Sequence, residues 1–285
     1  MSFADMPDLG PMQLPGAAAY AEQSLAWSRE TVAATRNLID IPYGPDFFQK
    51  LDIFLPHEEV RNAPVIFFLH GGAWQNGHKE WMGFMAPPLL AFPAIFVTAN
   101  YRLSPRVKYP VPVDDCWLAL RWIADNIARH GGDPDRIFIG GHSAGGHLAA
   151  LIALRPERAA AHGLKRDVIK GCLLVSSSLS LDLADAAPGS RREKMIRTIL
   201  ARAEDGPDGT ASSHVAGTTL PFFIAYGSAD QPELIEQNER LIGLLRREAC
   251  VVERYVFPGA DHFDTNLACR DPDGVWVRAV RRLVR

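Results

Sequence analysis

A serine flanked by glycines lies in residues 141–145, which read Gly-His-Ser-Ala-Gly and fit the pattern G-x-S-x-G. The apolar run 136–140 predicts a buried strand before it, and residues 144–154 predict a helix after it. A sharp strand-to-helix turn of this kind exposes a nucleophilic serine, and the small glycines leave room for the turn. The helix start also favours negative charge nearby. We therefore expect Ser143 to be a nucleophile; the simpler alternative is a glycine-rich turn with a serine cap.

A second glycine-rich loop follows another expected strand. Residues 70–74 read His-Gly-Gly-Ala-Trp and come directly after the apolar run 65–69. They match the HGGG-type loop whose backbone N–H groups hold the negative charge that develops on a reacting carbonyl oxygen. The residue after the serine supplies a further N–H group. We expect an oxyanion hole formed by the backbone N–H groups of Gly71, Gly72, Ala73 and Ala144. The alternative is an ordinary turn at the end of a strand.

An aspartate and a histidine follow two later expected strands. Asp230 lies in the loop after residues 222–226, and His262 lies in the loop after residues 251–257. Both loops leave the carboxyl ends of expected strands, as Ser143 does. The chain order serine, aspartate, histidine is that of a known hydrolase arrangement. In it, the aspartate orients the imidazole and the imidazole takes the serine proton.

Two other carboxylates compete for the role of the acid. Asp261 and Asp264 flank His262 in sequence, but neither reaches easily around to its Nδ1 atom. We therefore assign the acid to Asp230 and keep Asp261 and Asp264 as alternatives.

These side chains need a scaffold in which several strands end at one edge. A helix is expected over 17–35, and two strands at 36–41 and 50–55 flank a turn at 43–46, which predicts a hairpin. Strands and helices then alternate, and the strands 65–69 and 94–99 are almost continuously apolar, as in a sheet buried on both faces. The further expected strands are 65–69, 94–99, 136–140, 169–176, 222–226 and 251–257, and the further helices are 113–130, 144–154, 232–248 and 273–283. The pattern predicts an α/β fold with a mostly parallel sheet flanked by helices on both faces.

Residues 177–220 interrupt the alternation with an expected helix at 190–203 between Gly/Ser/Thr-rich flanks. We expect a cap-like insertion over the carboxyl edge of the sheet, where ligands bind in such folds. Residues 1–285 are then a single α/β domain with an N-terminal tail and helix at 1–35. The basic side chains of the inserted helix form a solvated face or meet a substrate carboxylate; they are Arg191, Arg192, Lys194 and Arg197.

The composition limits the partners. The chain has 285 residues, a formal net charge of -3 and 47% hydrophobic residues. No basic surface for nucleic acid is expected, and no apolar stretch approaches the length of a membrane helix. The first residues carry neither the positive charge nor the apolar run of a secretory signal, so we expect a cytoplasmic protein. We also expect a monomer or homodimer that acts on a small molecule.

Neither the cysteines nor the remaining histidines predict a metal site. No cysteine pair has the spacing C-x-x-C, and we expect buried, structural cysteines; they are Cys116, Cys172, Cys250 and Cys269. The histidines outside the proposed triad include His70, His142, His147 and His214. We expect His70 and His142 to shape their loops, His147 to pack, and His214 to lack a partner. No metal or cofactor is expected.

The motifs together resemble the hormone-sensitive-lipase-like branch of the α/β-hydrolases, and within it the kynurenine formamidases (arylformamidases). The resemblance covers nearly the whole chain, and it rests on residues 37–44, 51–56, 70–79, 141–149, 227–233 and 261–263. It implies the α/β-hydrolase fold, with catalytic roles for Ser143, Asp230 and His262. Residues 100–105 are more similar to the general esterase branch, and Ala73 stands where formamidases often carry a tyrosine.

The resemblance implies a serine hydrolase that cleaves a small carboxylic ester or an N-formyl aryl amide through an acyl-enzyme. A general carboxylesterase for small aryl or alkyl esters is the alternative, followed by a peptidase or long-chain lipase. A non-catalytic small-molecule binder on the same fold is the alternative of another class. Three aromatic side chains near the motifs are candidates for an apolar pocket, although such residues are often simply core; they are Trp74, Trp81 and Phe263.

Overall fold

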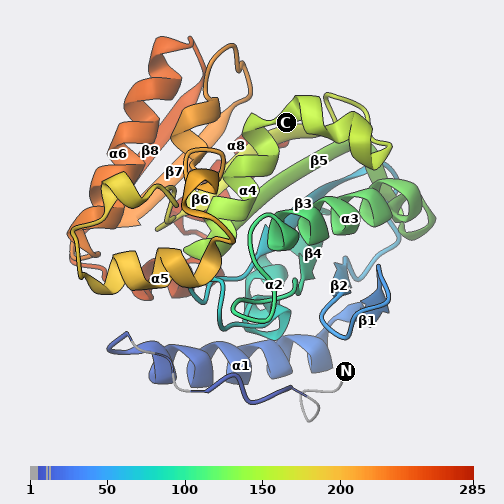
Figure 1. Cartoon of the computed structure of the whole chain (residues 1–285). Helices are drawn as coiled ribbons and strands as arrows, with labels where there is room; N and C mark the ends of the chain where they lie inside the picture. Colours follow the sequence, from blue (N-terminus) through green and yellow to red (C-terminus); the bar gives the residue numbers. More distant parts are fainter. Residues whose placement is uncertain (1–5, 11, 13) are drawn as a thin grey trace.

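A computed structural model describes residues 6–10, 12 and 14–285 of the chain. Its centre is one eight-stranded sheet in the order β1-β2-β4-β3-β5-β6-β7-β8 (Figure 1). The strands are β1 (Arg36–Pro42), β2 (Lys50–Leu55), β3 (Ala63–Leu69), β4 (Ile95–Ala99), β5 (Gly132–His142), β6 (Ile169–Val175), β7 (Phe222–Gly227) and β8 (Val252–Phe257). The pairs β1/β2 and β2/β4 are antiparallel and all other pairs are parallel. The expected hairpin and the mostly parallel sheet are confirmed.

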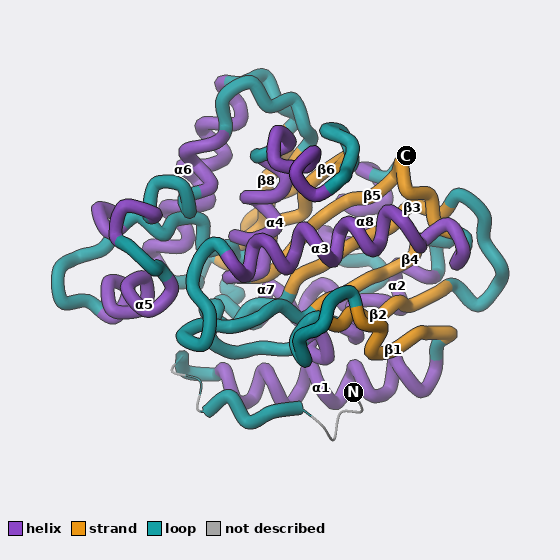
Figure 2. Tube along the Cα trace, turned by 45° about the vertical axis from the view of Figure 1, so that its right-hand side comes forward, coloured by secondary structure: helices purple, strands orange, loops and turns teal. Residues whose placement is uncertain are grey.

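Helices cover both faces of this sheet, as the alternating pattern predicted (Figure 2). They are α1 (Ala17–Ala34), α2 (Ala86–Leu90), α3 (Val111–Asn126), α4 (Ala144–Leu154), α5 (Arg191–Ile199), α6 (Pro232–Arg247), α7 (Asp264–Leu267) and α8 (Val275–Leu283). Side chains of α3, α4 and α6 share one hydrophobic core, and side chains of α1, α2 and α8 share the other.

The central strand β3 shows why two cores form. Successive side chains of a strand point to opposite faces of the sheet. Phe67 and Leu69 therefore pack in the core under α3 and α4, whereas Ile66 and Phe68 pack in the core under α1 and α8. All seven residues of β3 are buried, as a strand covered on both faces requires.

The inserted helix is shorter than the sequence predicts. Helix α5 begins after Ser190, whose side chain accepts a hydrogen bond from Glu193 N, and it ends at Ile199 rather than at residue 203. The chain becomes extended at Leu200 and forms a β-bridge with Tyr109. This pairing with a distant segment ends the helix, so the helical pattern alone overestimates its length.

One other helix end and one short helix also differ from expectation. The helix expected over 113–130 is α-helical only as far as Asn126, and its last turn, Ile127–His130, is a 3-10 helix that stops at Gly131. The short helix α2 was not predicted, because its sequence Ala-Pro-Pro-Leu-Leu contains two prolines. Proline is tolerated there because it lies in the first turn, whose N–H groups have no partner within the helix.

Candidate active site

Ser143 lies in the sharp turn between β5 and α4. Its φ of 55° and ψ of -119° are values that non-glycine residues seldom adopt. The turn is crowded: a Cβ atom on Gly141 would lie 2.3 Å from the carbonyl carbon of Gly145, and one on Gly145 would lie 2.2 Å from the carbonyl oxygen of Leu69. The glycines are therefore required by close backbone approach, as the motif predicts.

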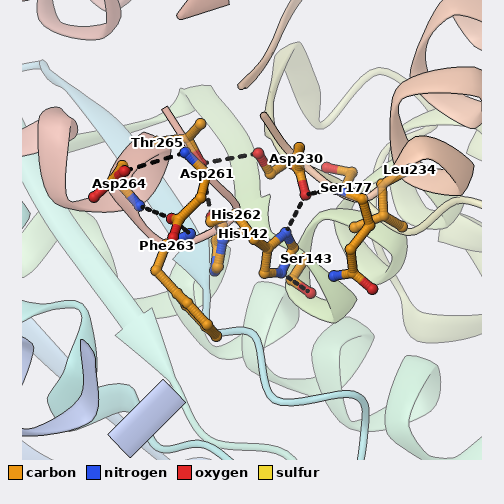
Figure 3. Close-up of polar contacts among 12 residues, drawn as sticks. His142, Ser143, Ser177, Asp230, Leu234, Asp261, His262, Phe263, Asp264 and Thr265 are labelled. Atoms are coloured by element: carbon orange, nitrogen blue, oxygen red, sulfur yellow. Dashed lines mark hydrogen bonds and ion pairs between the residues drawn. The ribbon is translucent and has the colours of Figure 1, made fainter. Parts of the chain in front are cut away.

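His262 connects Ser143 to Asp230 (Figure 3). Its Nε2 atom lies 3.0 Å from Ser143 Oγ, and its Nδ1 atom lies 3.0 Å from Asp230 Oδ1. A neutral imidazole protonated on Nδ1 fits both contacts, because it donates to the carboxylate and accepts from the hydroxyl. The side chains of Asp230 and His262 are 0% and 8% exposed, so water competes little for these bonds.

The loops after β7 and β8 hold the aspartate and the histidine side by side. Ala229 N donates to Ala260 O at 3.0 Å, and a Cβ atom on Gly227 would lie 2.1 Å from that oxygen. Asp230 Oδ1 also accepts from Gln231 N at 2.7 Å. Burial raises the pKa of Asp230, but the hydrogen bond and charge of His262, together with hydrogen bonds from Ser176 and Gln231, bring it below its ordinary value. The carboxylate therefore stays ionised near neutral pH.

The competing carboxylates are used elsewhere in the histidine loop. Asp261 accepts from the N–H groups of Phe263 and Asp264 at 2.8 and 2.9 Å, and Asp264 accepts from Asp261 N at 3.1 Å. Both side chains thus stabilise the turn around His262 and leave its Nδ1 atom to Asp230.

The loop after β3 turns back on itself beside the serine. Gly72 has a φ of 126°, and its carbonyl oxygen accepts from Gln75 N at 3.0 Å and from Asn76 N at 2.8 Å. A Cβ atom on Gly71 would lie 3.0 Å from Ser143 Cβ, so the two motifs are in close contact. Among the described residues, no backbone hydrogen bond outside the regular helices and strands is donated by the N–H groups of Gly71, Gly72, Ala73, Trp74 or Ala144.

A buried ion cluster holds the far end of this loop. The ammonium group of Lys79 is 0% exposed and lies 2.8 Å from Asp40, 2.7 Å from Asp52 and 2.8 Å from Glu80. Lys79 N also donates to Asn100 Oδ1 at 2.7 Å. The carboxylates come from β1, from β2 and from the residue that follows Lys79, so the cluster fixes the loop to the edge of the sheet. The sequence motif contains Lys79 but does not reveal its partners.

Two histidines of the motifs are buried and neutral. Burial lowers the pKa values of His70 and His142 to about 3. His142 Nε2 lies 2.9 Å from the carbonyl oxygen of His262, and His70 Nδ1 lies 2.7 Å from Gly71 O. These contacts agree with the expectation that both side chains shape their loops. His214, for which no partner was expected, lies 2.9 Å from Asp208 O through its Nε2 atom.

Of the three expected pocket aromatics, Trp74 and Trp81 are buried in the two cores at 2% and 6% exposure, and only Phe263 is half-buried.

Phe263 has an aromatic neighbour that the sequence did not predict. Tyr20 of α1 stacks on Phe263 at a centroid distance of 4.8 Å, and its hydroxyl donates to Asn266 Oδ1 at 2.7 Å. In the sequence, Tyr20 is only one apolar position of the helix expected over 17–35, and such a position does not indicate contact with the histidine loop.

The basic side chains of α5 differ in their surroundings. Arg197 pairs with Glu193 at 2.7 Å, and Arg191 donates to Gln231 Oε1 at 3.3 Å. Arg192 is half-buried and donates to Ser180 O at 2.8 Å, while its Nε atom has no partner among the described residues. Burial lowers the pKa of His147, which lies one turn after Ser143, and the charge of Arg192 lowers it further.

The described residues contain no group of three or more His, Cys, Asp or Glu side chains that could hold a metal ion. All four cysteines are buried and free, as expected. Among the helices that the structure describes, none is long and apolar enough to cross a membrane.

The sheet, the turn that carries Ser143 and the carboxyl-end loops that carry Asp230 and His262 define an α/β-hydrolase. Residues 51–245, more than half of the chain, match the BD-FAE family, and the chain belongs to that family.

Relatives and solved structures agree with this assignment. The chain is 37% identical over 187 residues to the carboxylesterase NlhH of Mycobacterium tuberculosis, covering 62% of this chain but only 55% of the relative. It is 27% identical over 235 residues to the kynurenine formamidase of Danio rerio, covering 81% and 76% of the two chains. A putative thioesterase from Silicibacter matches the fold with a TM-score of 0.77 at 20% identity, covering 97% of this chain and 99% of the other. The carboxylesterase EstE1 matches with a TM-score of 0.71 at 21% identity, covering 94% and 97%.

Proposed function

We propose that the chain is a serine hydrolase that cleaves a small carboxylic ester or an N-formyl aryl amide, most like an arylformamidase. The observation that carries the proposal is the continuous contact from Ser143 Oγ through His262 to Asp230, at 3.0 Å on each side of the imidazole. The N–H groups of the neighbouring loop at residues 70–74 add support, because a non-catalytic binder needs neither a triad nor an oxyanion hole.

The proposed reaction proceeds by acyl transfer in two steps. His262 Nε2 takes the proton of Ser143 Oγ as the oxygen attacks the substrate carbonyl, and Asp230 stabilises the imidazolium that forms. The N–H groups of Gly72, Ala73 and Ala144 hold the oxyanion, with Gly71 as a further candidate. His262 then protonates the leaving alcohol or amine, and water removes the acyl group by the same steps in reverse.

A general carboxylesterase for small aryl or alkyl esters is the second candidate. The 37% identity to a named carboxylesterase favours it, whereas the longer alignment to a kynurenine formamidase favours formamide hydrolysis. We place Phe263 beside the substrate's aromatic part and keep the buried Trp74 and Trp81 as further pocket candidates. We also propose a monomer or homodimer in the cytoplasm. Four free, buried cysteines support a reducing compartment.

A fluorophosphonate probe tests the enzyme class, because it labels only an activated serine. Labelling should occur on the wild-type chain and be absent in Ser143→Ala. A panel of N-formylkynurenine, phenyl acetate and alkyl acetates then tests the substrate. Faster turnover of the phenyl ester than of the formamide selects the carboxylesterase, and no labelling with no turnover selects the non-catalytic binder.

A further inference from the structure

One buried histidine outside the proposed triad bonds to two different segments around the site. His147 lies on α4, four residues after Ser143, and is 0% exposed. Its Nδ1 atom accepts a hydrogen bond from Trp74 Nε1 at 3.2 Å, and its Nε2 atom lies 2.6 Å from the carbonyl oxygen of Gly209. Trp74 belongs to the oxyanion loop, and Gly209 belongs to the insertion 177–220. One imidazole therefore joins both segments to the helix that carries the nucleophile.

The two partners fix the chemical state of the ring. An indole N–H can only donate and a carbonyl oxygen can only accept, so both bonds form only when His147 is neutral and protonated on Nε2. Burial lowers the pKa of His147 to about 4, although the bond to Gly209 raises it. The ring is therefore neutral near pH 7 and suited to holding its neighbours rather than to proton transfer.

The loop needs such support, because its backbone is strained. Ala73 and Trp74 have φ values of 53° and 59°, in the left-handed region that residues other than glycine seldom adopt. Strained residues persist only when their surroundings fix them. Trp74 is fixed at two points: its carbonyl oxygen accepts from Ser104 N at 2.8 Å, and its indole donates to His147.

The insertion is firmly attached at the point where His147 reaches it. Asp208, the residue before Gly209, accepts from Tyr109 Oη at 2.6 Å and pairs with Arg155 at 2.9 Å. If this part of the insertion shifted, the Gly209 carbonyl would move relative to the His147 imidazole. The imidazole would in turn move relative to Trp74.

We propose that His147 is a positioning residue that holds the oxyanion loop through Trp74 and couples this loop to the insertion 177–220. The insertion then acts on the chemical step as well as on substrate choice, which goes beyond the cap-like role expected from sequence. This inference rests on the proposed hydrolase function, because an oxyanion hole is detected through turnover and through the binding of a tetrahedral adduct on the serine.

The test compares Trp74→Phe, His147→Leu and the double variant with the wild-type protein. Active sites are counted with a fluorophosphonate probe, kcat and KM are measured with phenyl acetate, and Ki is measured with phenylboronic acid, which forms a tetrahedral adduct on serine. Each single variant should lower kcat per active site roughly tenfold and raise Ki similarly, with little change in KM, since small displacements near the reacting atoms have effects of this size. The double variant should be no worse than the worse single variant, because both remove the same contact.

Two further variants separate positioning from packing. His147→Asn keeps an acceptor near the Nδ1 position but cannot reach Gly209, so it should recover part of the kcat lost in His147→Leu. Trp276→Phe is the matched control: Trp276 is 0% exposed in the opposite core, and its Nε1 atom has no hydrogen-bond partner among the described residues. It should lower stability and leave kcat per active site unchanged.

The proposal is overturned if Trp74→Phe and His147→Leu keep wild-type kcat per active site, or if their losses multiply in the double variant. If His147→Leu does not fold, Trp74→Phe decides alone, because it keeps the aromatic ring. Failure of the wild-type chain to react with the probe would instead reject the hydrolase function, so the two failures are distinguishable.

Discussion

Lys79→Met would leave three carboxylates facing one another in a region closed to water. The side chains of Asp40, Asp52 and Glu80 are 13%, 4% and 2% exposed, and all three contact the Lys79 ammonium. Removing one partner of a buried ion pair costs about 3–5 kcal/mol, because the remaining charge is neither solvated nor paired. This is a large part of the roughly 5–15 kcal/mol that stabilises a typical domain. A drop in melting temperature on the order of 10 °C follows.

The pH dependence of that loss gives a sharper test. Burial raises the pKa of Asp52 to about 6, against the lowering effect of Lys79 and with a further rise from Glu80. A raised carboxylate pKa means that the folded state binds the proton more tightly than the unfolded state. Its contribution to stability is therefore fully present below the unfolded pKa of about 4 and is lost as pH rises through about 6. Without Lys79 the proton is bound more tightly still, so the variant's deficit should shrink on acidification.

Thermal unfolding followed by circular dichroism at about pH 8 and about pH 5 measures both effects. Lys165→Met is the matched control, because the Lys165–Asp135 pair is 69% and 60% exposed, and exposed pairs contribute little. Its melting temperature should stay close to that of the wild-type chain. The reasoning is refuted if Lys79→Met unfolds at the temperature of this control, or if its deficit grows as the pH falls.

Three further predictions concern the site itself. Ser143→Ala should lower kcat about 10⁶-fold without changing the melting temperature, because triad members act as a unit; a folded variant with near-normal turnover would exclude Ser143 as nucleophile. Asp230→Asn should lower kcat by about 10⁴-fold, whereas Asp261→Asn should affect mainly stability, and the reverse ranking in steady-state assays would reassign the acid. Arg192→Met should raise KM roughly tenfold for an aryl ester that bears a carboxylate and not for its neutral analogue. The control Lys194→Met should change neither KM value. Equal KM values for both substrates in the Arg192 variant would show that this guanidinium does not bind a substrate carboxylate.

The parts of the fold that follow from local pattern were predictable. Apolar strands, glycine stops and the motif around Ser143 placed the sheet and its carboxyl edge, because strand period and turn chemistry are properties of neighbouring residues. The end of α5 was not predictable, since it depends on the bridge between Leu200 and Tyr109. No local signal reports a contact between segments so far apart in sequence.

The same limit applies around the candidate site. The loop order placed Asp230 near His262, because parallel strands bring their carboxyl ends together. The contacts of Asp40 and Asp52 with Lys79 and the ring contact of Tyr20 depend on how β1, β2 and α1 pack, and these elements precede the first glycine loop. His147 was expected only to pack, because a histidine on an apolar helix does not reveal which carbonyl or indole it meets.

The stacking of Tyr20 on Phe263 has a consequence for comparing members of this family. Tyr20, Phe263 and His262 all lie outside residues 51–245, the segment that matches the family, and the Tyr20 ring stacks on Phe263. Two proteins could be identical throughout the shared segment and still present different surfaces beside the histidine. Homology over that segment covers Ser143 and Asp230 but not the histidine loop, and α1 can vary independently of both. Exchanging residues 1–35 between two family members would test whether substrate selectivity depends on α1.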